Sequence, residues 1–223
     1  MPVLTFLGHA CFSLHEPGKE SLIFDPFITG NPHAPVAADE ITVDFILVSH
    51  AHMDHLGDAY EIAARCGATI ISSAEIASEA LGKELQAHEQ HIGGRHRYPF
   101  GSVKLTPALH GAGIPGGHAC GFVVEFYGKK IYFAGDTGLF GDMKLIGELE
   151  APDLALLPIG DNYTMGIDDA VVAASFLKAP AVIPYHYNTW PLIEVDPRQF
   201  REKVEQNTEA CCMILAPGEW MEI

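Results

Sequence analysis

The segment that most constrains this chain is residues 48–58, VSHAHMDHLGD, which places three imidazoles and one carboxylate within six positions. The apolar run Phe45–Ser49 predicts a buried strand, so the polar groups fall on the loop at its C-terminal end. Four converging titratable groups would repel one another and gain little without a cation between them. A loop of merely solvated residues is therefore a poor interpretation, and the segment predicts a metal site.

The spacing within this segment divides the ligands into two sets. His50 and His52 alternate by two, so an extended backbone points both rings to the same side. Asp54 and His55 follow as the chain turns into a helix predicted to start at Gly57-Asp58. The segment thus presents one pair of ligands for each of two positions.

Three more groups of the same chemistry lie just beyond apolar runs later in the chain. They are His110 in LTPALHGAG, Asp136 in FAGDTG and His186 in VIPYHYN. The end of a strand is where α/β folds gather functional groups. We therefore expect these side chains to join the first cluster.

Five histidines and two aspartates are too many for one tetrahedral centre. We predict two divalent ions about 3.5–4 Å apart, which share a carboxylate and an exogenous oxygen. One ion is assigned to His50, His52 and His110, the other to Asp54, His55 and His186, with Asp136 as the bridge. Nitrogen and carboxylate ligands without thiolate select zinc, with manganese or iron as alternatives.

A water that bridges two such ions ionises near neutral pH, so the predicted reaction is hydrolysis by a metal-bridging hydroxide. The predicted substrate is a small ester, lactone or phosphoester, and no serine or cysteine nucleophile is needed. Asp54 and Asp136 are the predicted catalytic residues among the ligands. His9, in LGHACF, is predicted to contact substrate or to protonate the leaving group, and a hydrogen-bonded loop histidine is the alternative.

Four residues are further candidates for substrate contact or for holding a ligand in place. Asp25 ends an early strand and is placed to orient a ligating imidazole. Asp161 and Asn162 follow the run Leu154–Pro158, where ordinary turn chemistry is the alternative. Asn188, two residues after His186, is a candidate for the rim of the site.

Apolar and alternating runs predict an α/β protein that forms a single domain over residues 1–223. Strands are predicted at Val3–Leu7, Cys11–Leu14, Leu22–Phe24, Phe45–Ser49, Thr69–Ser72, Val103–Thr106, Gly121–Phe126, Lys130–Ala134, Leu154–Pro158, Ala181–Pro184 and Cys212–Leu215. Helices are predicted at Asp58–Cys66, Ala74–Leu85, Asp168–Lys178 and Pro197–Gln206. A hairpin is expected to turn at Gly128-Lys129, and His88, His91 and His96 are expected on a polar surface connection.

Composition limits the partners. The chain has 13 Lys and Arg against 29 Asp and Glu, a formal charge of −16, so nucleic acid is an unlikely partner and a membrane is not expected. No run approaches the roughly 18 apolar residues of a membrane span, and the N-terminus lacks a basic signal-peptide region. Five cysteines without CxxC spacing fit a reducing compartment, so we expect a cytoplasmic protein with a small-molecule substrate.

The motif HxHxDH, the later His, the bridging Asp and the final His resemble, in order, the metallo-β-lactamase superfamily. The resemblance implies an αβ/βα sandwich of two mixed β-sheets, with helices on the outer faces and a binuclear site at one edge. The blocks GHACF, LTPALH, GDTGLFGDMKLIGE, LLPIGDNYTMG and VIPYHYNTWPLI are similar to small metal-dependent hydrolases related to ascorbate-phosphate lactonases. These relatives keep a histidine at the place of His9, and they make a homo-oligomer reasonable.

Two alternatives stay open within this resemblance. The first is a phosphodiesterase or nuclease that acts on short nucleotides, although nuclease branches normally carry an added nucleic-acid-binding domain. The second is a di-iron redox protein, although redox members normally work with a flavin domain.

Overall fold

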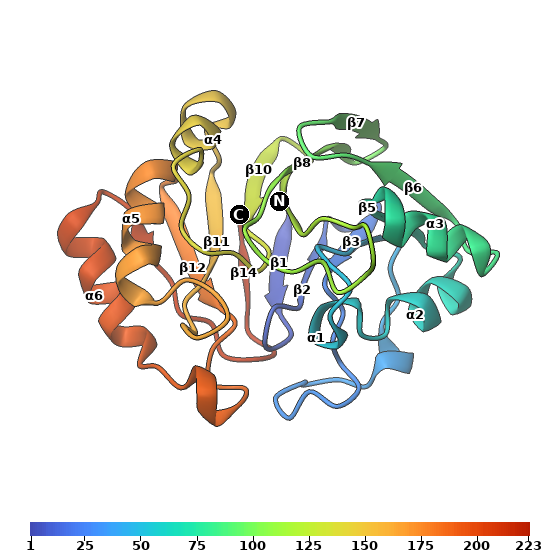
Figure 1. The fold of residues 1–223 in the computed structure, drawn as a ribbon, viewed down its shortest axis with the longest axis horizontal. Helices are drawn as coiled ribbons and strands as arrows, with labels where there is room; N and C mark the ends of the chain where they lie inside the picture. The colour runs from blue at the N-terminus through green and yellow to red at the C-terminus, as the bar shows by residue number, and fades with distance from the viewer.

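Two seven-stranded sheets pack face to face, and helices cover the outer side of each (Figure 1). The computed structural model describes residues 1–223. Helices α2 and α3 lie on one outer side, and α4, α5 and α6 lie on the other, so the layers run α, β, β, α. The predicted αβ/βα sandwich of two mixed β-sheets is confirmed.

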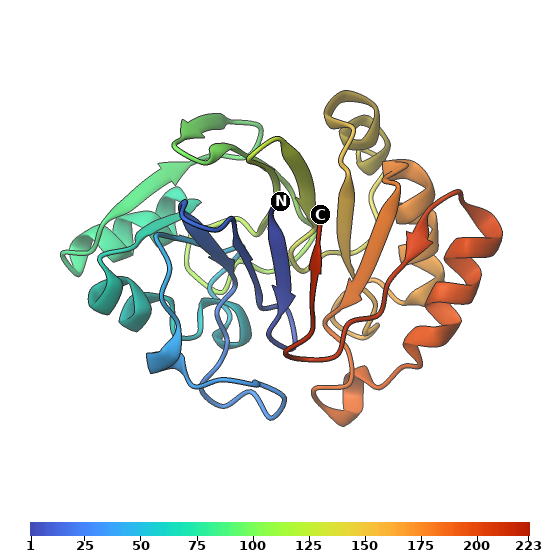
Figure 2. The same ribbon diagram turned by 180° about the vertical axis from the view of Figure 1, so that it is seen from behind.

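The first sheet has the strand order β14-β1-β2-β3-β4-β5-β6. Its strands are β1 (Val3–Phe6), β2 (Phe12–His15), β3 (Ser21–Phe24), β4 (Phe45–Leu47), β5 (Thr69–Ser73), β6 (Ala87–Gln90) and β14 (Trp220–Glu222). The strands from β14 to β3 pair antiparallel, and those from β3 to β6 pair parallel. Figure 2 shows β14 beside β1, so the two ends of the chain meet in this sheet.

The second sheet repeats this plan with the order β13-β12-β11-β10-β9-β8-β7. Its strands are β7 (Arg95–Tyr98), β8 (Gly101–Pro107), β9 (Cys120–Phe126), β10 (Lys129–Phe133), β11 (Leu154–Pro158), β12 (Ala181–Tyr185) and β13 (Cys211–Cys212). The strands from β7 to β10 pair antiparallel, and those from β10 to β13 pair parallel. Each sheet is therefore an antiparallel meander extended by parallel strands.

Helices supply the long connections that parallel strands require. They are α1 (Met53–Leu56), α2 (Ala59–Cys66), α3 (Ala74–Gly82), α4 (Met143–Glu150), α5 (Ile167–Leu177) and α6 (Pro197–Asn207), with 3₁₀ turns η1 (Ala38–Glu40) and η2 (Pro191–Ile193). The longest, α5 and α6, have 11 residues each, and no helix could cross a bilayer.

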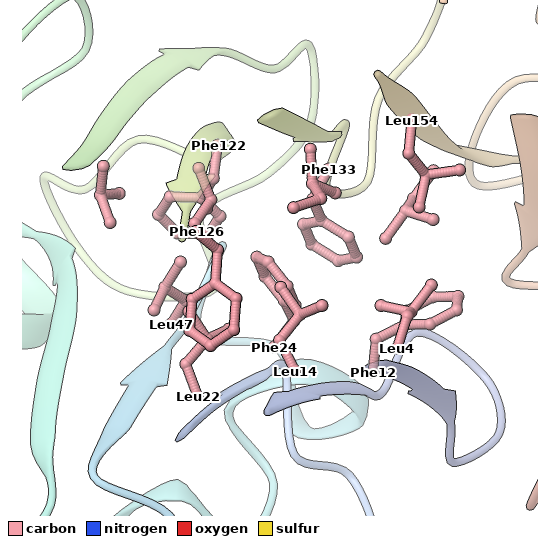
Figure 3. Close-up of a cluster of buried hydrophobic side chains, with 14 of the residues drawn as sticks. Leu4, Phe12, Leu14, Leu22, Phe24, Leu47, Phe122, Phe126, Phe133 and Leu154 are labelled. Carbon is pink, nitrogen blue, oxygen red and sulfur yellow. The ribbon is translucent and has the colours of Figure 1, made fainter. Parts of the chain in front are cut away.

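The main hydrophobic core lies between the two sheets and takes side chains from both (Figure 3). At its centre, Phe24 of β3 stacks on Phe133 of β10 with ring centroids 4.9 Å apart. Tyr185 of β12 stacks on the same Phe133 ring at 5.1 Å. The contact between Phe24 and Phe133 joins the two sheets near their strand ends, one residue before Asp25 and three before Asp136, and Tyr185 directly precedes His186.

Sequence reasoning missed the most polar strands. The short strands β6 and β7 are edge strands of opposite sheets, and their sequences AHEQ and RHRY lack apolar alternation because solvent covers one side. The prediction of a polar connection for His88 and His96 was wrong. Their rings lie 4.0 Å apart, centroid to centroid, across the two sheet edges, and His88 is half-buried.

Other differences are local. The hairpin between β9 and β10 turns at Tyr127-Gly128, one residue earlier than predicted, and both have positive φ (46° and 86°), as a type I′ turn requires. Helix α4 was not predicted because it is short and Asp142, at its N-cap, makes no capping hydrogen bond. The last predicted strand, Cys212–Leu215, is reduced to the pair Cys211–Cys212, and β14 and the one-turn helix α1 carry no strong pattern.

Replacing Phe24 by Ala should lower the free energy of unfolding by about 3–5 kcal/mol, because the ring fills the centre of the inter-sheet core. Urea unfolding with a chelator present measures this loss without a contribution from bound metal. Leu149→Ala is the control, since Leu149 is 74% exposed and its loss should cost less than about 0.5 kcal/mol. Equal losses in the two variants would contradict this assignment of the core.

Candidate metal centre

All seven predicted ligands meet at one edge of the sandwich, beyond the ends of four strands. They are His50 and His52 after β4, Asp54 and His55 on α1, His110 after β8, Asp136 after β10 and His186 after β12. Helix α1 ends at Gly57, whose φ is 41°, and a Cβ there would lie 2.5 Å from the Pro26 carbonyl oxygen. Only glycine fits this contact, which holds the ligand-bearing turn against the loop after β3.

The first ligand set consists of three imidazoles. His50 Nε2 lies 3.0 Å from His52 Nδ1, and His110 Nε2 lies 3.3 Å from the same atom. His50 is fully buried, whereas His52 and His110 are partly exposed. The three nitrogens therefore converge on one point that solvent reaches from one side.

The second set joins one carboxylate to two imidazoles. Asp54 Oδ2 lies 3.6 Å from His55 Nε2 and 3.7 Å from His186 Nε2. The rings of His55 and His186 are nearly parallel, with centroids 5.5 Å apart. Both rings are buried, and the Asp54 carboxylate is partly exposed, so this set too has one open side.

Asp136 faces both sets with one oxygen. Its Oδ2 lies 3.1 Å from His186 Nε2 and 3.2 Å from His55 Nε2, and 3.6 Å from His110 Nε2 and 3.9 Å from His50 Nε2. The residue is only 2% exposed. A single carboxylate thus stands between the two groups of ligands.

A buried aspartate beneath the site fixes two of the imidazoles. Asp25 accepts hydrogen bonds from Ser49 N (2.7 Å), from Ser49 Oγ (2.6 Å) and from His55 Nδ1 (2.7 Å). Because the Ser49 hydroxyl proton is given to Asp25, its oxygen accepts from His50 Nδ1 at 2.9 Å. His50 and His55 therefore carry their protons on Nδ1 and turn the Nε2 lone pairs toward the centre.

Backbone strain accompanies this arrangement. His9, Asp25 and His186 all have positive φ, at 57°, 39° and 56°. Such a conformation costs a non-glycine residue on the order of 1–3 kcal/mol and persists where the surrounding structure enforces it. At these three residues the strain lies at strand ends that deliver side chains to the site.

The donor atoms fit a bound cation. His55 Nε2, both ring nitrogens of His186 and Asp136 Oδ1 are buried and have no hydrogen-bond partner. Leaving such atoms unpaired is costly, and a metal ion would satisfy the inward-facing ones. The nitrogen and oxygen donor set, without thiolate, suits first-row divalent metals.

The electrostatics of the site point the same way. Burial raises the pKa of Asp136, but His186 and His55 outweigh it and hold that pKa well below its usual range. Burial lowers the pKa of His186, yet Asp136 and Asp54 raise it to about 9. The ionised carboxylates are therefore stabilised by positive charge beside them, which a divalent ion would provide.

His9 lies behind the second set and contacts two of its members. Its ring is fully buried, which is the main reason that its pKa falls to about 4, so the ring is neutral at pH 7. Nδ1 accepts from Thr189 Oγ1 at 2.7 Å, and Nε2 donates to Asp54 Oδ2 at 3.2 Å. The His9 carbonyl oxygen accepts from the backbone N–H of His186 at 2.8 Å.

The other candidates lie apart from the ligands. Asp161 and Asn162 form an exposed turn after β11, where Asp161 Oδ1 accepts from Asn162 N at 2.9 Å. The Asn188 side chain accepts from Val195 N at 2.8 Å and so braces the loop after β12. No hydrogen bond joins any of these three to a ligand, and the Asp161 and Asn188 side chains accept from backbone N–H groups of their own loops.

Sequence reasoning missed the two hydroxyl groups of the site, those of Ser49 and Thr189. Ser49 directly precedes His50, and Thr189 follows His186 by three residues, but Ser and Thr are common at strand ends. Asp58 stands at the start of the predicted helix Asp58–Cys66, yet its side chain makes no capping hydrogen bond to α2. Instead its carboxylate accepts from Ile28 N (2.9 Å) and Thr29 N (2.8 Å) and holds the loop after β3.

Comparison with known proteins agrees with this fold. The family described as the beta-lactamase superfamily domain matches residues 20–187. A UPF0173 metal-dependent hydrolase of Natranaerobius thermophilus is 54% identical over 220 residues, 99% of each chain. A protein of the same description from Pelotomaculum thermopropionicum is 51% identical over 228 residues, again 99% of each. Igni18, a metallo hydrolase of the hyperthermophilic archaeon Ignicoccus hospitalis, has a TM-score of 0.93 at 39% identity, covering 100% of this chain and 99% of that one.

The fold and these matches define the class, a protein of the metallo-β-lactamase superfamily, as the resemblance of the motifs predicted. Within that class the chain belongs to the family of UPF0173 metal-dependent hydrolases. The prediction of a metal-dependent hydrolase is confirmed at this level.

Asp25→Asn should weaken metal binding about 10–100-fold, because an NH2 donor replaces one of the two oxygens that together accept from Ser49 N, Ser49 Oγ and His55 Nδ1. Competition against a metal-binding dye measures the affinity. Asp44→Asn is a matched control, since Asp44 also accepts from a serine N and Oγ, those of Ser21, but is exposed and remote. Unchanged affinity in Asp25→Asn would show that Asp25 does not orient the ligands.

Proposed function

We propose that this protein binds two divalent ions and uses them to hydrolyse a small ester, lactone or phosphoester by direct attack of water. The observation that carries the proposal is the position of Asp136 Oδ2, within 3.1–3.9 Å of four imidazole nitrogens, two from each ligand set. Five histidines and two aspartates exceed the capacity of one tetrahedral centre. Their separation into two sets supports a binuclear site.

His50, His52 and His110 would hold one ion, Asp54, His55 and His186 the other, and Asp136 would contact both. Zinc is the proposed metal, and manganese and iron suit the same donors. When bound, the pair would polarise the scissile group and lower the pKa of a water held between them.

The protein's own contribution is to hold the donors rigidly and to leave one side open. Asp25 and Ser49 fix the tautomers of two buried imidazoles, so no reorientation is needed when an ion arrives. His52, Asp54 and His110 form the partly exposed side of the centre. We propose that substrate approaches over these three residues.

Asp136→Ala should reduce the metal content from about two ions per chain to one or fewer and abolish hydrolysis, because both ligand sets lose their shared carboxylate. Elemental analysis after exhaustive dialysis, beside assays of ester, lactone and phosphoester substrates, measures both effects. Asp142→Ala, at an exposed aspartate without a capping contact, is the control and should keep metal and activity.

Other results of this experiment would exclude parts of the proposal. One tightly held ion in the unmodified protein, unaffected by Asp136→Ala, would indicate a mononuclear or structural site. Bound iron with a redox-active visible spectrum and no hydrolysis would favour a redox protein.

His9 is proposed to position the second ligand set. Its ring donates to Asp54 and its carbonyl oxygen accepts from the backbone of His186. Since its one ring proton is engaged with Asp54 and its ring is buried, this geometry supports positioning over protonation of a leaving group.

His9→Ala should therefore lower both the metal content and kcat, each about tenfold or more, as loss of an outer-shell partner does. His9→Gln, which keeps an amide N–H that can reach Asp54, should recover part of both. His15→Ala, at an exposed histidine remote from the site, is the control. Full metal content with a lost turnover in His9→Ala would instead assign His9 to the substrate.

A further inference from the structure

The loops at the metal edge contain no lysine or arginine. These loops follow the strands at the edge where the ligands converge and comprise residues 7–11, 25–37, 48–58, 108–119, 134–142, 159–166 and 186–196. All 13 basic side chains lie elsewhere in the sequence, and the same loops carry five acidic residues besides Asp25, Asp54 and Asp136. A phosphate or carboxylate group remote from the metals would find no counter-charge here, because Lys and Arg are the residues that bind such groups.

Exposed apolar side chains stand next to the partly exposed ligands in the sequence. Met53 stands between the ligands His52 and Asp54 in the sequence and is 85% exposed. Leu109 directly precedes His110 and is 59% exposed. Exposed apolar side chains beside a site with a few polar groups are typical of pockets that bind apolar ligand parts.

The exposure of these side chains is built into the backbone. Leu109 N donates to Thr137 Oγ1 at 2.9 Å, and Leu109 O accepts from Gly138 N at 3.2 Å. Met53 O accepts from Gly57 N at 3.1 Å within α1. Both residues are therefore held outward by the same turns that deliver the ligands.

An aromatic pair borders the second ligand set. The ring of Trp190 lies 4.9 Å from that of His9 and 6.2 Å from that of Phe27, centroid to centroid. Trp190 is 36% exposed, so part of its ring remains free for contact. Exposed apolar surface thus lies near both ligand sets, since Leu109 precedes His110 of the first set and Trp190 contacts His9, which hydrogen-bonds to Asp54 of the second.

We infer that the substrate is an uncharged carboxylic ester or lactone with an apolar acyl part that contacts Met53, Leu109 and Trp190. This inference rests on the proposed hydrolytic function and narrows it. Water adds to the carbonyl carbon, the bond from that carbon to the alkoxy oxygen breaks, and the alcohol leaves with one proton of the water. The acid then loses its proton to solvent, so the products are a carboxylate, an alcohol and a proton.

Two esters with the same leaving group test the inference on the metal-loaded protein. p-Nitrophenyl hexanoate ends in a methyl group, and the mono-p-nitrophenyl ester of adipic acid ends its chain of equal carbon number in a carboxylate. After subtraction of uncatalysed hydrolysis, kcat/KM should favour the hexanoate at least about tenfold, because the carboxylate would lie unpaired on an apolar, acidic rim. Equal values, or a preference for the adipate, would overturn the inference.

A charge placed at the rim provides the second measurement. Leu109→Lys should raise the adipate-to-hexanoate ratio of kcat/KM at least about fivefold, since an ammonium would then face the terminal carboxylate. Leu149→Lys adds the same charge at an exposed leucine of α4 and should leave the ratio unchanged. An equal change in both variants would mean that net charge, and not the rim, sets the preference, and would overturn the inference.

The outcomes separate this inference from the function on which it rests. If the protein with two bound ions hydrolyses the adipate ester preferentially, hydrolysis stands and the apolar acyl site is wrong. If it hydrolyses neither ester but does hydrolyse p-nitrophenyl phosphate, the binuclear hydrolase stands and the carboxylic ester class is wrong. If it hydrolyses none of the three, the proposed function fails and the inference fails with it.

Discussion

The aromatic stack between the sheets is the contact on which the site depends. Phe24 packs on Phe133 in the shared core, and these residues stand one and three positions before Asp25 and Asp136. One carboxylate orients the imidazoles beneath the site, and the other faces both ligand sets. Because protein interiors are close-packed and resist small displacements, the core fixes the separation of the two carboxylates. The geometry of the predicted metal site is therefore set by the packing of apolar side chains in the core.

The two sheets share one plan but use it differently. Asp25 follows β3 and Asp136 follows β10, the last meander strand in each sheet. Both are buried and both contact imidazoles. Both carboxylate oxygens of Asp25 accept hydrogen bonds, whereas Asp136 retains a buried oxygen without a partner. The number of hydrogen bonds at equivalent positions thus distinguishes a supporting carboxylate from one free to bind a cation.

Much of this architecture could be predicted from sequence because the strongest signals coincide with the strongest constraints. Buried strands such as β11 need unbroken apolar runs, and the residues of HxHxDH have no other reason to cluster. The edge strands β6 and β7 escaped prediction because their pairing is satisfied by backbone hydrogen bonds while solvent accepts any polar side chain. The contacts of Ser49 and Thr189 were equally hidden, since a hydroxyl group acquires its partner only when distant segments meet.

The predicted ligands come from both sheets. Retention of metal therefore depends on the packing of the two halves of the chain against each other. The N-terminal half supplies His50, His52, Asp54 and His55, and the C-terminal half supplies His110, Asp136 and His186. A molecule whose halves have not docked offers only a partial set of donors to a metal ion. Bound metal stabilises the native state by mass action. Partly assembled chains lack a complete set of donors and do not gain this stabilisation. Metal occupancy of the centre would then indicate that folding is complete. The concentration of free metal in the cell would set how much more stable fully folded molecules are than partly folded ones.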